Sequence, residues 1–189
     1  MTKKEVKKVV KQSLLSGKTK QETFEELEMT SEFPPEKLAR IIRGIPTLQA
    51  RKKHKTLNII LITLLSLTIL FKVLAGIPIV VENGIKWIPI LFLLPIINII
   101  LLVGVATYSQ GGYKAVAILT ILGVLQTFGK MWGEPFDPFI LIDFVVAAGL
   151  ITLGFYLNSK FFPEYLISEE CYRDSEGEYK LKYVIQFED

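Results

Sequence analysis

The chain has 189 residues, 50% of them hydrophobic, and a formal net charge of +3 at pH 7. One histidine and one cysteine, Cys171, exclude an internal disulfide and any metal site built from several cysteines. The charge is uneven: residues 1–56 carry a net +7, residues 57–158 are neutral and residues 159–189 carry −4. Composition therefore predicts a basic head and an acidic tail on either side of a neutral, apolar block.

Residues 1–50 are predicted to form a three-helix N-terminal segment on the cytoplasmic side of a membrane. The apolar positions of its first helix follow the spacing of one helical face: Val6, Val9, Val10 and Leu14. Thr19-Lys-Gln-Glu22 is a capping box that opens the second helix, and Pro35 and Gly44 suit the start and end of the third. A helix-turn-helix DNA-binding unit is the alternative, but four glutamates crowd the middle helix and would repel phosphates. We therefore expect a small bundle and no nucleic-acid partner.

Residues 51–56 form a polybasic juxtamembrane flank whose candidate residues for lipid headgroups or topology are Arg51, Lys52, Lys53 and Lys55. Basic residues beside a membrane span stay in the cytoplasm. They also attract anionic lipid. Both roles can hold together, and His54 belongs to the same flank.

Residues 57–162 are predicted to form a transmembrane domain of four helices. Each apolar run has about the 20 residues that cross ~30 Å of hydrocarbon. The expected spans are residues 57–77, 87–108, 113–131 and 138–157. Gly76-Ile-Pro78 is expected to end the first span and Pro95 to kink the second. Because no continuous apolar run precedes residue 57, we expect an uncleaved first span and no cleaved signal peptide.

The basic residues that flank the four spans predict the topology. Six lie on the side of the termini and two on the other side, where three acidic residues offset them. We therefore expect a multi-pass protein of the cytoplasmic (inner) membrane with both termini in the cytoplasm.

Residues 163–189 form an acidic cytoplasmic tail and are predicted to fold as a β-hairpin. One strand is indicated by the alternation of apolar positions at Tyr179, Leu181, Tyr183, Ile185 and Phe187. Residues 165–172 are its expected partner, with a turn at 174–177. An isolated hairpin is barely stable in water, so we expect its apolar face to be covered by Val6, Val9 or Leu38 of the head.

The segment from Ser16-Gly-Lys-Thr-Lys-Gln-Glu22 through Ile41-Ile-Arg-Gly-Ile-Pro46 to the basic flank resembles that of uncharacterised small bacterial multi-pass membrane proteins. This resemblance covers about a third of the chain and implies no activity.

No catalytic arrangement is recognisable in the sequence. The predicted spans contain one carboxylate and no histidine or cysteine, and the chain has no glycine-rich phosphate loop and no nucleophile elbow. We therefore expect a protein that is not an enzyme and that uses no metal or cofactor.

Four polar side chains inside the spans are the candidate site residues: Lys72, Asn98, Gln126 and Asp143. Such groups are costly in lipid and are therefore informative. Counting depth at 1.5 Å per residue predicts that Asn98 meets Gln126 and that Lys72 pairs with Asp143. Structural interhelical bonds and a transport path are both open; the two differ in whether these residues face a shared cavity.

The sequence thus predicts an α-helical integral membrane protein with four transmembrane helices, an N-terminal helical segment and a hairpin-like tail. The preferred function is a non-enzymatic module that recruits or senses a protein partner through its cytoplasmic head and tail. The alternative is an oligomeric channel, a transporter subunit or a membrane-perturbing effector, for example of a defence or toxin/immunity type. Expected partners are the lipid bilayer, anionic lipid included, and an unidentified protein; a homo-oligomer is also open.

Overall fold

The computed structural model of the chain describes residues 2–31, 33–131, 138–173 and 179–187. The chain divides into two compact units. We call residues 1–53 together with 159–189 the head unit, and residues 54–158 the membrane unit. The hairpin turn predicted at 174–177 lies outside the described residues.

The head unit begins with short helices that carry their own start signals. Its helices are α1 (Lys3–Leu15), α2 (Lys20–Thr30), α3 (Pro35–Arg43) and α4 (Leu48–Lys53). The predicted capping box is confirmed: the Thr19 hydroxyl accepts from the Glu22 N–H at 3.1 Å, and the Glu22 carboxylate accepts from the Thr19 N–H at 2.8 Å. Thr2 and Glu5 form a second capping box at the start of α1, which was not predicted from sequence.

Both capping carboxylates titrate below their ordinary range. The backbone N–H of Thr19, followed by its hydroxyl, lowers the pKa of Glu22, and Thr2 lowers the pKa of Glu5 in the same way. A hydrogen bond donated to a carboxylate favours the ionised form. Helices α1 and α2 are therefore held at their N-termini by ionised glutamates.

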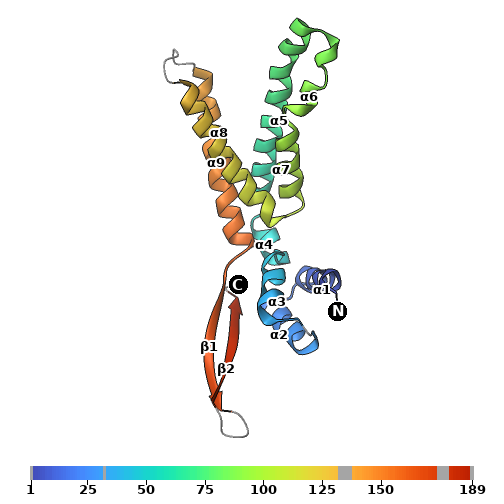
Figure 1. Ribbon diagram of the computed structural model, residues 1–189, viewed down its shortest axis with the longest axis vertical. Coiled ribbons are helices and arrows are strands. Elements are labelled where there is room, and N and C mark those ends of the chain that lie inside the picture. The colour runs from blue at the N-terminus through green and yellow to red at the C-terminus, as the bar shows by residue number, and fades with distance from the viewer. Residues whose placement is uncertain (1, 32, 132–137, 174–178, 188–189) are drawn as a thin grey trace. The chain divides into compact units, whose positions relative to one another are not determined.

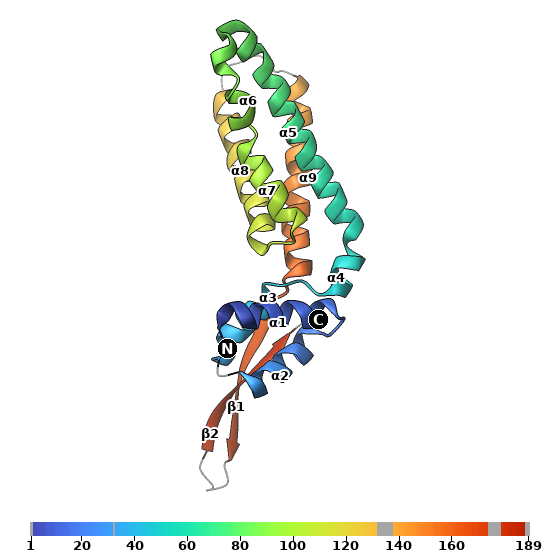
Figure 2. The same cartoon turned by 90° about the vertical axis from the view of Figure 1, so that its right-hand side faces the viewer.

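The predicted hairpin is confirmed. Strand β1 (Tyr165–Arg173) pairs antiparallel with β2 (Tyr179–Phe187), with Tyr165 opposite Phe187 and Ile167 opposite Ile185. Figures 1 and 2 show that one end of the hairpin lies beside the helices of the head unit while the other end extends past them.

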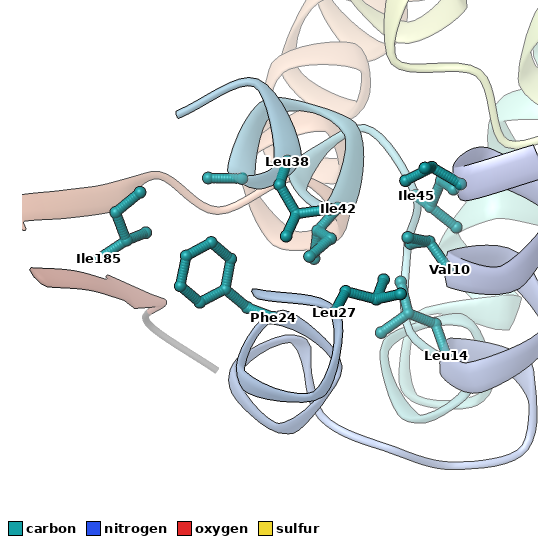
Figure 3. Close-up of a cluster of buried hydrophobic side chains, with 10 residues drawn as sticks. Val10, Leu14, Phe24, Leu27, Leu38, Ile42, Ile45 and Ile185 are labelled. Atoms are coloured by element: carbon teal, nitrogen blue, oxygen red, sulfur yellow. The ribbon is translucent and has the colours of Figure 1, made fainter. Parts of the chain in front are cut away.

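One end of the hairpin completes the apolar core of the head unit, as predicted for Ile185 and Phe187; the side chains of residues 179–183 lie outside those that the structure describes. Figure 3 shows Phe24 of α2 between Ile185 of β2 and the side chains of α3, with Leu38 among them. All three side chains are buried, and the rings of Phe24 and Phe187 are 6.0 Å apart. Val6 belongs to the same cluster, and Val9 packs against it. Three apolar helix faces and one strand end thus share a core that none of them could build alone.

Polar contacts also tie the helices to the segment that leads into the hairpin. The Arg43 guanidinium pairs with Glu164 at 2.7 Å, and the Lys20 ammonium donates to the Phe161 carbonyl at 3.3 Å. The Phe187 N–H donates to the Gln21 side chain at 3.2 Å. Residues far apart in sequence therefore close one folded unit.

The membrane unit contains the helices that could cross a bilayer. Within the described ranges four segments are long and apolar enough: Lys55–Asn83, Ile85–Ala106, Gln110–Phe128 and Leu141–Phe161. The fold class predicted from sequence is therefore confirmed, as a mostly helical chain with four candidate spans and a C-terminal two-stranded sheet. The first, third and fourth segments belong to α5 (Lys55–Asn83), α8 (Gln110–Met131) and α9 (Pro138–Phe161). The second consists of η1 (Ile85–Trp87), α6 (Ile90–Leu93) and α7 (Ile96–Ala106).

Two proline predictions need correction. Pro78 does not end the first span, because α5 continues through it to Asn83, and the Gly84 N–H still donates to Val80 at 2.9 Å. Membrane helices tolerate proline where neighbouring groups make up the lost bond. Pro95 does more than kink the second span, since it lies between the separate helices α6 and α7.

Small residues bring the helices together at one end of the membrane unit. A Cβ on Gly112 of α8 would lie 2.7 Å from the carbonyl carbon of Gly104 on α7, and a Cβ on Gly154 of α9 would lie 3.2 Å from the Tyr113 carbonyl oxygen. Helices α5 and α7 form one arm of the membrane unit, and α8 and α9 form the other. From this end the α5–α7 arm and the α8–α9 arm diverge (Figure 1).

Candidate intramembrane binding site

The four polar residues predicted inside the spans line the same cleft of the membrane unit. Each comes from a different span: Lys72 from α5, Asn98 from α7, Gln126 from α8 and Asp143 from α9. The cleft lies between the two arms and has a volume of about 670 Å³. This volume is within the ~300–1,000 Å³ typical of small-molecule sites. Most of the remaining lining is aliphatic or aromatic, as such sites usually are.

A chain of hydrogen bonds organises the α5–α7 wall of the cleft. The Lys72 ammonium donates to Asn98 Oδ1 at 2.7 Å, and Asn98 Nδ2 donates to the Thr68 hydroxyl at 2.8 Å. The Thr68 hydroxyl donates in turn to the Leu65 carbonyl at 2.8 Å. Asn98 therefore bridges α5 and α7 and at the same time fixes the position of the ammonium group.

The α8–α9 wall presents its polar groups without such a network. Gln126 and Asp143 are exposed, and within the described part of the chain neither makes a hydrogen bond or ion pair. The nearby hydroxyls of Thr120 and Thr127 donate to carbonyls of their own helix, at 2.7 and 3.0 Å. The amide and carboxylate on this wall therefore remain available to an occupant of the cleft.

The pairings predicted from depth are not formed among the described residues. Lys72 bonds Asn98 and not Asp143, and no hydrogen bond joins Asn98 to Gln126. The predicted first span ended at residue 77, and this end placed Lys72 too close to the predicted membrane boundary. Since α5 runs to Asn83, Lys72 is ~16 Å from its end, which is the depth that Asn98 has when counted from Trp87.

A second polar cluster, at the converging end, was missed from sequence. The Tyr113 hydroxyl lies 2.6 Å from Asn58 Oδ1 and 3.2 Å from the Val105 carbonyl. Tyr113 is fully buried and Asn58 is 3% exposed. Nearby in sequence, His54 contacts the ring of Tyr156 edge-on at 5.8 Å. One signal could have found this cluster: Asn58 is a polar residue within an apolar run.

The basic flank is helical. Arg51, Lys52 and Lys53 form the last turn of α4, and Lys55 begins α5. The three lysines are exposed and Arg51 is half-buried. Their charges therefore lie at the start of the first candidate span.

The described residues contain no group of three or more histidine, cysteine, aspartate or glutamate side chains placed to hold a metal ion. The Cys171 thiol is exposed and forms no disulfide with any described residue. The cleft is thus distinguished by one cation, one carboxylate and two amides in an apolar surround.

No family model, no curated protein and no solved structure matches the chain.

Proposed function

We propose that the membrane unit binds a polar or amphiphilic molecule inside the bilayer, as a channel- or transporter-type protein rather than an enzyme. The observation that carries this proposal is that each of the four candidate spans contributes a charged or amide side chain to the lining of the same cleft. Side chains kept for helix assembly alone would satisfy one another, because an unpaired polar group in hydrocarbon is costly. Asn98 fits that description, but Gln126 and Asp143 face the cleft with no partner among the described residues.

A variant that fills the cleft tests this function. A Cβ on Gly123, which lines the cleft, would meet no atom within 4 Å, so Gly123→Phe is expected to occupy the cleft without disturbing the helices. The full chain, purified in mild detergent, should carry a small molecule detectable by native mass spectrometry, and Gly123→Phe should lose it. Ser66→Ala is the matched control, because Ser66 lies on α5 outside the cleft and bonds its own helix. Equal retention of the molecule by both variants would refute an intramembrane binding site.

Recruitment of a protein partner through the head unit is a second candidate function. It is supported by the exposure of Leu166 (59%) and Ile167 (47%) on β1, next to the end of the hairpin that packs on the helices. Adjacent residues of a strand point to opposite faces, so both faces of the hairpin are apolar there. A photoreactive amino acid at Leu166 should crosslink a partner in cells, whereas one at the exposed Lys37 should not. Identical crosslinking at both positions would argue against this function.

We further propose that both termini lie in the cytoplasm of a cell whose inner membrane holds the spans. Support comes from the excess of Lys and Arg on the side of the termini. The exposed lysines of the flank would then lie against anionic headgroups, which attract each basic residue by about 1 kcal/mol. A cysteine introduced at Gln12 should resist an impermeant thiol reagent in intact cells and react after lysis; reaction in intact cells would reverse the topology.

A further inference from the structure

The cleft has a cation on one wall and a carboxylate on the other. Lys72 donates to Asn98, so its ammonium is held on the α5–α7 arm. Asp143 belongs to the α8–α9 arm, and its side chain is exposed. No ion pair joins the two among the described residues. The two formal charges therefore stay separated across the cleft.

The two walls, which differ in charge, also differ in the hydrogen-bonding groups that remain unused. The Lys72 ammonium has three N–H donors, one of which is used by the bond to Asn98 Oδ1. The Asn98 amide has two N–H donors, one of which is used by the bond to the Thr68 hydroxyl. The facing wall offers the two carboxylate oxygens of Asp143 and the amide oxygen of Gln126. One wall can thus donate to an anionic group while the other accepts from a cationic one.

An occupant with a single charge would leave one wall uncompensated. An anion bound to Lys72 would leave the Asp143 carboxylate alone in the membrane, and a cation bound to Asp143 would leave the ammonium. Removing a lone charge from water carries a large desolvation cost unless it is paired. A molecule with both an anionic and a cationic group satisfies both walls at once.

We propose that the cleft holds a zwitterionic aminophospholipid, with its phosphate on Lys72 and Asn98 and its ammonium on Asp143 and Gln126. This inference rests on the proposed function of the cleft. A primary ammonium is favoured over a trimethylammonium because it can donate hydrogen bonds to the carboxylate and the amide. A lipid is favoured over a soluble zwitterion because large apolar side chains at the cleft, such as Phe71, Leu122 and Ile142, are exposed and suit acyl chains.

Native mass spectrometry of the full chain tests the class of lipid. The protein is equilibrated with equal amounts of phosphatidylethanolamine, phosphatidylcholine and phosphatidylglycerol that carry the same acyl chains. Phosphatidylethanolamine should be enriched in the bound fraction. Its binding should fall about tenfold in Asp143→Asn and in Lys72→Met, the change expected when one charge contact is lost. Lys86→Met removes a lysine that does not line the cleft and should leave binding unchanged.

A charge swap gives the decisive readout. Lys72→Asp combined with Asp143→Lys should restore phosphatidylethanolamine binding, because a zwitterion can bind in the reversed orientation. If Lys72→Met lowers the melting temperature through loss of its bond to Asn98, Asp143→Asn still carries the test, since Asp143 has no described partner to lose. Full retention of phosphatidylethanolamine by Asp143→Asn would overturn the zwitterion. Enrichment of phosphatidylglycerol that is lost in Lys72→Met and kept in Asp143→Asn would also overturn the zwitterion.

Those two outcomes would leave a lipid in the cleft and so keep the proposed function. If no variant, Gly123→Phe included, changed the amount of bound lipid, both the binding site and the zwitterion would be refuted.

Discussion

Asn98 has two roles that can be separated by substitution. Its oxygen accepts from Lys72 and its amide donates to Thr68, so one side chain joins α5 to α7 and positions a cation. Only one part of this arrangement could be predicted from sequence, namely that Asn98 is a polar residue whose placement in lipid costs free energy. The identity of its partners could not, because Lys72 was placed at the wrong depth and no local pattern marks Thr68 as a partner for a residue on another helix.

Asn98→Leu should destabilise the membrane unit by about 1–2 kcal/mol. Interhelical hydrogen bonds in membranes average ~0.6 kcal/mol each, and two are lost while the ammonium is left without its acceptor. Thermal unfolding in detergent measures this, with Ser66→Ala as a control that removes only a bond within α5. Equal melting temperatures for the two variants would mean that Asn98 does not hold the helices together.

Two glycines of α8 lie in different surroundings, one against the backbone of a neighbouring helix and one at the cleft. At Gly112 the backbone of α7 lies so close that no side chain fits, whereas Gly123 faces the open cleft. No local sequence pattern distinguishes these two positions, because the distance from a glycine to another helix depends on how the helices pack. The distinction follows from the point at which the arms converge.

Substitution of each glycine by alanine should therefore have opposite effects. Gly112→Ala should destabilise the protein, because its Cβ would lie 2.7 Å from backbone that cannot move independently of α7. Gly123→Ala should be neutral or stabilise by up to ~1 kcal/mol, the difference in helix propensity between the residues. Melting temperatures of the two variants in the same detergent give the comparison. Similar losses in both would contradict the close approach of α7 and α8.

The start of α2 should respond to acid through Glu22. The pKa of Glu22 is lowered in the folded chain, so its contribution is complete above the ordinary value of 4.5. It is lost as the pH falls below that value through the lower folded pKa, because the protonated carboxyl accepts less well from the Thr19 N–H. Glu22→Gln should remove this part of the acid sensitivity of α2, measured by amide exchange between pH 3 and 6. Glu28→Gln, at the other end of the same helix, should retain it.

The molecule consists of two units, and some of their features could be predicted from sequence while the cleft could not. The spans and the hairpin were found because long apolar runs and strict alternation are strong local signals. The joining of head and tail was also predicted, from two apolar faces that each lacked a partner. The cleft was not, because it depends on divergence of the arms from the contact between Gly104 and Gly112, which no local pattern encodes.

Ile185→Ala should destabilise the head unit far more than its position near one end of the chain suggests. Ile185 is buried among α2 and α3, and truncation of a buried isoleucine costs about 2–5 kcal/mol. Amide exchange in α2 and α3 should accelerate together with exchange in β2. Leu166→Ala, at an exposed site of the same hairpin, should change exchange little. Faster exchange in β2 alone would show that the helices fold without the hairpin.

The shared core also sets an order of events during synthesis. Ile45 and Ile185 belong to the same core but are 140 positions apart, and all four candidate spans are encoded between them. At ~5–20 residues per second a ribosome needs about 7–28 s to cover that interval. During that time the helices of the head have been made while the strand that completes their core has not. A nascent head with an uncovered apolar face must therefore wait until the candidate spans and the hairpin have been synthesised, which gives chaperones and quality-control proteases a defined interval in which to act.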